Sequence, residues 1–316
     1  MKKITIYTPH RVGGPWLWGK NLAEKINIYS NKFKASHEFR TINLLSTPFW
    51  TNSDIVHSVN PIPFRLWRKP YILTIKGNFY QETSNPYSRF YPMAIKNADL
   101  VTVPSLYLKG QLGLKNAVVI PNAVDLEKFS FIERGQQKSN KPIEILTVTK
   151  FYFEDKAEGV LNIIETLEEF QKISSIKFSY TVLGEGEFLE KTKEKAKNYN
   201  VKVKFAGHQN PKPHLENADI FAYYSTHDNM PNVILEAMST GLPVITNNIG
   251  AVSEMIENNK DGIIVNDKKN YLDNISKLIQ DENFRLTIGR NARKSVENRF
   301  SWKTNIQEWL KIYEKI

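Results

Sequence analysis

Cysteine is absent from the 316-residue sequence. This absence excludes disulfide bonds, zinc sites built on cysteine, iron–sulfur clusters and a thiol nucleophile. The chain also lacks any stretch near the roughly 20 apolar residues that a membrane-spanning helix needs. Its basic first residues are not followed by the apolar segment of a signal peptide. We therefore expect a cytoplasmic protein without thiol chemistry.

Patterns that bind metals or dinucleotides are missing as well. The six histidines form no His-Glu-x-x-His motif, and the sequence contains no Asp-x-Asp pair. It also contains no Gly-x-Gly-x-x-Gly fingerprint of dinucleotide-binding proteins. The sequence therefore predicts neither a metal site nor a bound cofactor.

Charge is distributed unevenly along the chain. Residues 1–140 contain 19 Lys and Arg against 8 Asp and Glu, whereas residues 141–316 contain 24 against 25. The net charge of +10 therefore comes from the first half. Such an excess favours an anionic partner, and nucleic acid, an anionic lipid surface and a phosphorylated substrate all fit it.

Aromatic residues stand beside several of these basic residues. Those that we expect to be exposed are Trp16, Trp18, Phe64 and Trp67, which lie close to Arg11, Lys20, Arg65, Arg68 and Lys69. Tryptophan suits the headgroup region of a bilayer, and Lys and Arg bind an anionic leaflet. We therefore expect the first half to dock on an anionic membrane surface, as a peripheral protein on the inner face of a membrane, or on a lipid-phosphate-linked acceptor. The alternative is that these aromatics are core or cleft residues and that the charge only aids solubility.

Short β-rich runs alternate with amphipathic helical stretches, and one of the predicted strands covers residues 39–45. In the predicted helix 159–172, an apolar stripe is formed by Val160, Ile163, Ile164, Leu167 and Phe170. This alternation is typical of α/β folds, in which helices cover both faces of a parallel sheet. The polar, unpatterned segment 133–142 predicts a linker. We therefore expect domains at 1–138 and 139–302, and a last helix, 303–316, that packs outside the second sheet.

Two loops in the second half carry residues suited to a diphosphate ligand. Lys150 and Lys156 follow the first strand of that half, at the end of the strand where open α/β sheets bind ligands. Asp228 lies in a loop before a helix whose N-terminus can hold an anion. Glu236 lies one turn inside that apolar helix, where packing alone does not explain a carboxylate.

The first half offers a weaker signal of the same kind. Gly13 and Gly14 precede the first predicted helix, where backbone N–H groups can approach an anion. His10, at the end of the first strand, is a candidate for lining a cleft. Glycines in such turns are often needed only for the backbone conformation of the turn, without any ligand. These residues therefore do not identify a function by themselves.

The segment 228–244, DNMPNVILEAMSTGLPV, resembles family 4 of the retaining glycosyltransferases. Members of that family carry Glu-x7-Glu, usually followed by Ala-Met, and then Gly-x-Pro-Val. Further family-like pieces follow in the expected order and span nearly the whole chain. They are Gly13-Gly14, 54–57, 120–129, Lys156 with Gly159, 182–186, 203–207, 218–220, 253–254, 261–262 and 300–302.

The resemblance implies a GT-B fold. In that fold two Rossmann-like, doubly wound lobes flank an interdomain cleft that holds the active site, and a C-terminal helix crosses back to the first lobe. The first lobe would bind the acceptor and the second the nucleotide sugar.

The same resemblance implies the roles of single residues. Asp228 would contact the transferred sugar, and the catalytic residues would be Asp228, Lys76 and His10. Glu236 would bind the ribose hydroxyls and Lys156 the phosphate. The full set of donor-binding residues would be Gly13, Gly14, Lys150, Lys156, Asn229, Met230, Pro231, Asn232 and Glu236.

Three positions depart from the family pattern. Asp228 replaces the first Glu with a shorter carboxylate. Thr149-Lys150 replaces Gly-Arg, which loses the bidentate phosphate binding of arginine. Lys76-Gly77 stands where the family commonly has His-Gly near the transferred sugar. These departures leave the donor and the acceptor open.

From these features we expect a retaining, metal-independent glycosyltransferase that transfers a hexose. The donor would be a nucleotide-diphosphate sugar, and the acceptor a glycan, glycolipid or lipid-linked molecule in the synthesis of cell-surface polysaccharide or glycoconjugates. A nucleotide-sugar epimerase of the same architecture and a basic nucleic-acid-binding protein remain as alternatives. The sequence shows no convincing acid–base set for the first and no known motif for the second, so no nucleic-acid partner is expected.

Overall fold

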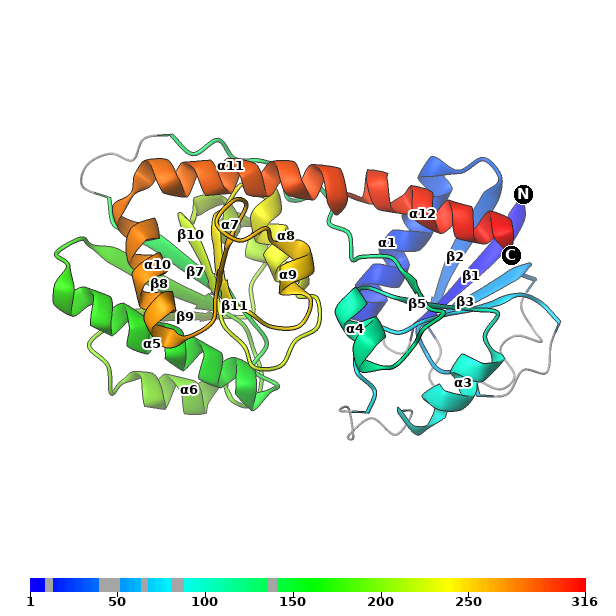
Figure 1. Ribbon diagram of the computed structural model, residues 1–316, viewed down its shortest axis with the longest axis horizontal. Helices are drawn as coiled ribbons and strands as arrows, with labels where there is room; N and C mark the ends of the chain where they lie inside the picture. Colours follow the sequence, from blue (N-terminus) through cyan, green and yellow to red (C-terminus); the bar gives the residue numbers. More distant parts are fainter. Residues whose placement is uncertain (9–13, 40–51, 64–67, 81–87, 136–140) are drawn as a thin grey trace. The chain divides into compact units, whose positions relative to one another are not determined.

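A computed structural model describes residues 1–8, 14–39, 52–63, 68–80, 88–135 and 141–316. The chain forms two compact units: unit 1 consists of Met1–Asn122 and Trp302–Ile316, and unit 2 of Ala123–Ser301. Each unit has its own six-stranded sheet, in which every paired strand runs parallel to its neighbour (Figure 1). The expected α/β class with two Rossmann-like sheets is confirmed.

Unit 1 has the strand order β2-β1-β3-β4-β5-β6. Its strands are apolar because helices and loops bury them; Ile4, Ile6, Val56 and Ile72 are at most 1% exposed. Its elements are β1 (Lys2–Thr8), α1 (Gly14–Tyr29), β2 (Phe33–Phe39), β3 (Ile55–Ser58), β4 (Tyr71–Thr74), η1 (Ser88–Phe90), α3 (Tyr91–Asn97), β5 (Leu100–Val103), α4 (Leu106–Gln111), β6 (Val118–Val119) and α12 (Trp302–Lys315).

The strand predicted at residues 39–45 shares only Phe39 with a strand that the structure describes. The second strand of the chain is β2, which ends at Phe39, and residues 40–45 lie outside the described residues. β2 is the edge strand of the sheet and pairs only with β1 in the described structure. An edge strand is only half covered, so its sequence, FKASHEF, mixes polar and apolar residues and gives a weak strand signal.

Helix α12 belongs to unit 1, as the expected crossing of the last helix requires. It packs on α1, and its Trp309 ring lies 5.6 Å from the ring of Trp18 in an edge-on arrangement. The side-chain amide of Asn305 also donates a hydrogen bond of 2.7 Å to the carbonyl of Pro121. The apolar stripe of the last helix therefore completes the core of unit 1.

Unit 2 begins at Ala123, earlier than the predicted boundary at 138. The amide of Val124 donates to the carbonyl of Phe300 at 2.9 Å, and Phe129 is buried in the core of unit 2. The Arg134 guanidinium then donates to backbone carbonyls far along the chain in the same unit, those of Ala218, Thr240 and Leu215. Such anchors are long-range contacts, which the local sequence pattern does not reveal.

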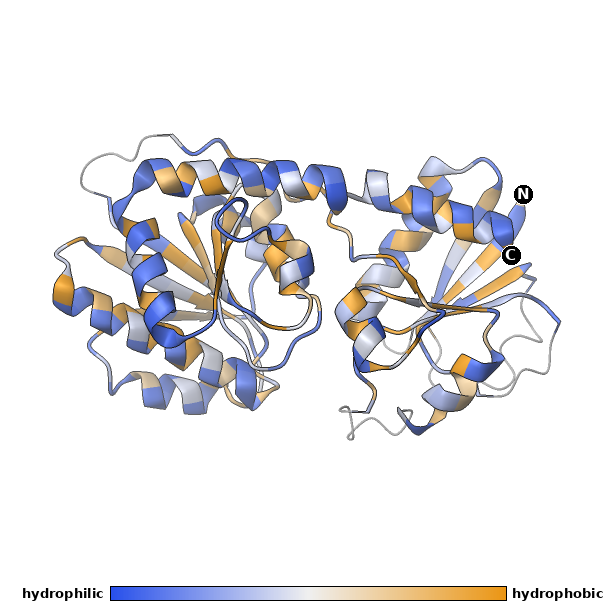
Figure 2. Cartoon of the chain, in the orientation of Figure 1, coloured by the Kyte–Doolittle hydropathy of each residue, from blue (hydrophilic) through white to orange (hydrophobic). Residues whose placement is uncertain are grey.

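Unit 2 has the strand order β12-β11-β10-β7-β8-β9, and Figure 2 shows its strands coloured mostly as hydrophobic. Its elements are β7 (Ile143–Val148), α5 (Glu154–Ile173), β8 (Phe178–Leu183), α6 (Leu189–Ala196), β9 (Val203–Gly207), α7 (Pro211–Asn217), β10 (Ile220–Tyr223), α8 (Asn232–Ser239), β11 (Val244–Asn247), α9 (Val252–Met255), β12 (Ile263–Val265), α10 (Lys268–Gln280) and α11 (Glu282–Arg299). None of the helices in the described part of the chain has the length and apolar composition required to cross a membrane.

Candidate functional site

The sheet of unit 2 has a topological switch point at β7. The chain passes from β7 to β8 on one side, whereas β10 pairs with β7 on the other side. Ligands of open α/β sheets bind at such a point, outside the carboxyl ends of the strands. The loops that leave the sheet there are 149–153 after β7 and 224–231 after β10.

An ion pair joins the ends of these two loops. Nζ of Lys156, in the first turn of α5, donates to Oδ2 of Asp228 at 2.7 Å, and the two side chains are only 17% and 19% exposed. The Tyr223 hydroxyl donates to the same oxygen at 2.6 Å, and the amide of Asn229 donates to Oδ1 at 3.0 Å. Burial, with the nearby charge of Asp228, raises the pKa of Tyr223 well above its usual value. The Asp228 carboxylate is therefore held in one orientation.

Gly159 permits this approach. A Cβ at position 159 would lie 1.9 Å from the carbonyl oxygen of Tyr224, closer than any side chain allows. Only glycine lets α5 lie against the chain that leaves β10, and this contact brings Lys156 within reach of Asp228. The Lys156 and Gly159 spacing seen in the sequence thus has a packing role in addition to any role in binding.

The loop before α8 is fixed by a second glycine. Gly250 has a φ of 55°, and a Cβ there would lie 2.3 Å from the Asp228 carbonyl oxygen. The amide of Ala251 donates to the Asn229 carbonyl at 2.7 Å. Because a trans peptide directs its N–H opposite to its C=O, the amide of Met230 points away from Ala251.

The start of α8 differs in detail from the expected binding loop. Pro231, in an extended conformation, is the residue before the helix, and Asn232 is the first residue of the helix. Proline has no N–H, so Pro231 contributes shape but no donor to an anion. The backbone donors of this helix end come from Asn232 and the residue after it.

Glu236 lies one turn inside α8. Burial raises its pKa to about 7, against the smaller opposing effect of the Lys128 charge. Among the described residues, no hydrogen bond to its carboxylate is found. A poorly solvated carboxylate of this kind is suited to accept hydrogen bonds from the hydroxyl groups of a ligand.

The loop after β7 presents Lys150 to solvent. This loop is held against the turn after β8, where Gly184 and Gly186 have φ angles of 154° and 143°. A Cβ at either position would lie 2.2 Å from the backbone of residue 149 or 151. The Gly-Glu-Gly turn is therefore explained by this close contact, which makes the loop that carries Lys150 rigid.

Four of the predicted site residues belong to unit 1, and only part of that site is described. His10 and Gly13 lie outside the described residues, whereas Gly14 is the first residue of α1. Lys76 follows β4; its Nζ donates to Oδ1 of Asn122 at 3.0 Å and lies 4.1 Å from the ring centre of Trp18. Burial lowers the pKa of Lys76 to about 7.

Beneath Lys76 lies a buried histidine. Nδ1 of His57 is 2.7 Å from the Tyr313 hydroxyl, and Nε2 is 2.6 Å from Oγ1 of Thr74. Burial, and secondarily the charge of Lys76, lowers the pKa of His57 to about 3, so the ring is neutral. The ring of Trp18 contacts His57 edge-on at 5.4 Å.

Several of these residues were missed by sequence reasoning. Tyr223 gave one signal, since it is a polar aromatic residue at the carboxyl end of a strand five positions before Asp228. Trp18 and Asn122 gave none, because their contact with Lys76 joins segments that are far apart in the sequence. His57 stood in a family-like piece, but nothing there indicated its partners.

One expectation about exposed aromatics is wrong. Trp18 is buried, at 7% exposure, because it packs beneath Lys76 and against α12. Trp16 is partly buried, and Arg11, Phe64, Arg65 and Trp67 lie outside the described residues. Large apolar side chains of unit 1 that are exposed include Met93, Leu106 and Tyr107.

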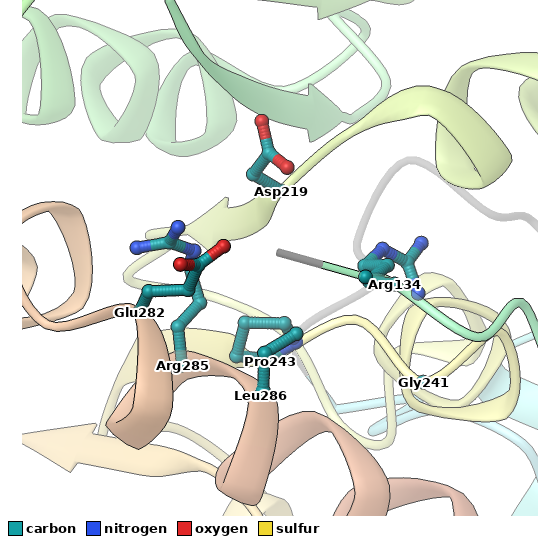
Figure 3. Close-up of a pocket in the computed structure, with 8 residues that line it drawn as sticks. Arg134, Asp219, Gly241, Pro243, Glu282, Arg285 and Leu286 are labelled. Carbon is teal, nitrogen blue, oxygen red and sulfur yellow. The ribbon is translucent and has the colours of Figure 1, made fainter. Parts of the chain in front are cut away.

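A small pocket in unit 2 lies at the opposite edge of the sheet, near the amino ends of β10 and β11. Figure 3 shows Asp219, Glu282 and Arg285 around it, with Arg134 on the other side. Both arginines donate to backbone carbonyls, Arg134 to four and Arg285 to those of Leu278 and Ile279. These contacts hold the fold together, and the pocket is separate from the switch point.

Within the described ranges, no three His, Asp or Glu side chains come together closely enough to hold a metal ion. The charged groups at the switch point are instead Lys150, Lys156, Asp228 and Glu236, next to the N-terminus of α8. Two cations and a helix end are suited to a diphosphate, and two carboxylates to hydroxyl groups.

Comparison with known proteins shows the family to which the chain belongs. The family of glycosyl transferases group 1 matches residues 129–295, more than half of the chain. The chain belongs to this family. Together with the two parallel sheets and the likeness to solved structures, this establishes the GT-B fold.

Individual relatives are similar to this chain at low sequence identity. An uncharacterised glycosyltransferase of Methanocaldococcus jannaschii is 28% identical over 74% of this chain and 64% of its own length. The UDP-Gal:alpha-D-GlcNAc-diphosphoundecaprenol alpha-1,3-galactosyltransferase of Escherichia coli is 27% identical over 62% of this chain and 53% of its own. The chain thus spans less than two thirds of the length of these relatives. The structure of Anabaena HepE with UDP-glucose superposes with a TM-score of 0.78 and 16% identity, covering 100% of both chains.

Proposed function

We propose that the protein is a retaining glycosyltransferase that uses a nucleotide-diphosphate sugar. The observation that carries this proposal is the Lys156–Asp228 pair at the switch point of unit 2, beside the N-terminus of α8. Its membership in the family, and the UDP-glucose bound in the HepE structure, support the same class of donor.

The ion pair exchanges partners when the donor binds. A diphosphate carries more negative charge than one carboxylate, so it draws Nζ of Lys156 to itself. Asp228 stays in place because Tyr223 and the Asn229 amide still hold it. Its Oδ2 is then available to accept a hydrogen bond from a hydroxyl of the transferred sugar.

The remaining groups complete the donor site. Lys150 and the amides at the start of α8 face the diphosphate, and Glu236 accepts hydrogen bonds from the ribose hydroxyls. Negative charge develops on the leaving diphosphate as the glycosidic bond breaks, and fixed cations and dipoles stabilise that charge. These lysines take the place of a divalent metal, so the reaction is metal-independent.

Transfer proceeds with retention. The bond between the anomeric carbon and the phosphate oxygen breaks, and the acceptor oxygen bonds to that carbon on the same face. The leaving phosphate oxygen accepts the acceptor's hydroxyl proton. This route needs no nucleophile from the protein.

The acceptor is a glycan, glycolipid or lipid-linked molecule, bound by unit 1, and the transferred group is a hexose. Counted over its two segments, unit 1 has 19 Lys and Arg against 7 Asp and Glu, whereas unit 2 has 24 against 26. The positive unit 1, with exposed Met93, Leu106 and Tyr107, suits an anionic membrane surface. The lipid-linked acceptor named for the E. coli relative supports this direction and a role in polysaccharide or glycoconjugate synthesis.

A screen of nucleotide sugars for protection against thermal unfolding tests the proposal. A ligand present at 100 times its Kd stabilises the folded state by about 2.7 kcal/mol. The best donor is then incubated with lipid-linked and glycan acceptors, and NMR of the product reports the anomeric configuration. Inversion contradicts the retaining mechanism, and isomerisation of the donor without an acceptor indicates an epimerase. Stabilisation by nucleic acid, but by no nucleotide sugar, contradicts the proposal as a whole.

A further inference from the structure

Unit 1 has a switch point of its own. β1 pairs with β2 on one side and with β3 on the other, and α1 follows β1. Lys76 emerges from the carboxyl end of β4, the strand next to β3. Its ammonium lies on the ring of Trp18 in α1, so the two elements meet at the edge of the sheet where α/β folds bind ligands.

The immediate partners of Lys76 favour a positive charge. The face of an indole ring attracts a cation, and Nζ lies 4.1 Å from the centre of the Trp18 ring. Oδ1 of Asn122 accepts a hydrogen bond of 3.0 Å from Nζ. Burial disfavours the charged form of Lys76, as its lowered pKa shows. An anion bound at this place would therefore interact with the ammonium more strongly than it would at the surface.

The Trp18 ring on which the Lys76 ammonium lies is itself held in place by neighbouring side chains. Trp18 contacts His57 at 5.4 Å and Trp309 of the last helix at 5.6 Å. His57 is held on both ring nitrogens, by Tyr313 and Thr74. A cation whose support is locked by packing and hydrogen bonds is the arrangement that specific recognition requires.

We propose that Lys76 binds an oxyanion, a carboxylate or phosphate oxygen, of a substrate of this enzyme. The inference rests on the proposed function, and it assigns Lys76 to substrate selection. Two sources supply such a group: the carboxylate of a uronic acid in the donor, and the phosphate that joins an acceptor sugar to its lipid. The net positive charge of unit 1 raises the local concentration of either one.

Matched ligands separate these sources. Calorimetry compares UDP-glucuronate with UDP-glucose, which differ at one carbon, and an alkyl glycosyl phosphate with the corresponding alkyl glycoside. The variants are Lys76→Met, which keeps the length but removes the charge, and Lys76→Arg, which keeps the charge. Lys115→Met, at an exposed lysine of the same unit, is the control. Circular dichroism verifies folding, and Lys76→Gln replaces the Met variant if that one does not fold.

Lys76→Met should lower the affinity for the charged ligand of one pair about tenfold or more. It should change the affinity for the neutral ligand of that pair by less than about twofold. Lys76→Arg should retain most of the affinity for the charged ligand. Lys115→Met should change the affinity for neither the charged nor the neutral ligand. A selective loss in the donor pair identifies a uronate, and one in the acceptor pair identifies a phosphate. Equal losses for charged and neutral ligands, or no loss in either pair, overturn the inference.

Binding of UDP alone keeps the two proposals apart. The wild type should bind UDP, and Lys76→Met should leave that affinity unchanged. If UDP binds normally but no charged ligand depends on Lys76, the oxyanion site is wrong and the proposed function stands. If the wild type binds neither UDP nor any other nucleoside diphosphate, the proposed function fails, and the oxyanion site fails with it.

Discussion

Replacing Glu236 with Gln should stabilise the protein while weakening its hold on the nucleotide. The substitution removes a poorly solvated negative charge and keeps the shape of the side chain. Burial raises the pKa of the Glu236 carboxyl from 4.5 to about 7. A folded-state pKa above the unfolded value means that the ionised form disfavours folding.

The size of the effect follows from the same shift. A difference of about 2.5 pKa units corresponds to at most roughly 3.4 kcal/mol, and the partial solvent access of Glu236 reduces this to about 1–3 kcal/mol. The penalty is absent below pH 4.5, grows as the pH rises to about 7, and is constant above that value. Wild type and Glu236→Gln should therefore be equally stable at pH 4.5 and differ most at pH 8.

Urea unfolding at several pH values, followed by circular dichroism, measures this difference. Glu158→Gln, which removes an exposed carboxylate of the same unit, is the control and should show no comparable trend. Calorimetry with UDP should show a loss of roughly tenfold or more for Glu236→Gln, because a charged hydrogen bond is worth about 1.5–3 kcal/mol. A stability difference that does not grow with pH would refute the role of burial. Unchanged UDP affinity would refute the ribose contact.

Three further predictions concern catalysis and the membrane. Lys156→Ala should lower kcat/KM more than Lys76→Ala, because Lys156 faces the developing diphosphate charge; losses in the reverse order would contradict this assignment. Transfer should continue in excess chelator, since lysines stabilise the leaving group, and loss of activity would instead show a metal requirement. Leu106→Asp should reduce co-sedimentation with anionic vesicles and Ile173→Asp in unit 2 should not; binding that ignores lipid charge and salt would defeat electrostatic docking.

The α/β class could be predicted from the sequence because a parallel sheet covered on both faces has apolar strands throughout. The edge strand β2 and the boundary of unit 2 could not. β2 is only partly covered, and the segment before Arg134 is held to unit 2 by donors that reach carbonyls more than 80 positions away. Contacts of that range leave no periodic pattern.

The donor site was predictable in part for a similar reason. Lys156 and Asp228 each follow a strand, and both were named as candidate ligand residues from that position alone. The carboxyl ends of the neighbouring parallel strands β7 and β10 lie at one edge of the sheet, which brings their loops together. Lys76 lies on the Trp18 ring because of the way α1 packs over the sheet, and this packing cannot be predicted from the sequence pattern. The burial of Trp18 follows from the same packing and from α12.

Because α12 belongs to unit 1, the two units complete their folds at different times during synthesis. Unit 2 is one continuous segment, whereas unit 1 needs both residues up to Asn122 and the helix that starts at Trp302. At about 5–20 residues per second, a ribosome adds the intervening segment in roughly ten to thirty-five seconds. During that time the surface that Trp309 and Tyr313 later cover stays open on the nascent chain. Unit 2 can thus finish folding first, whereas unit 1 completes its core only when synthesis reaches α12.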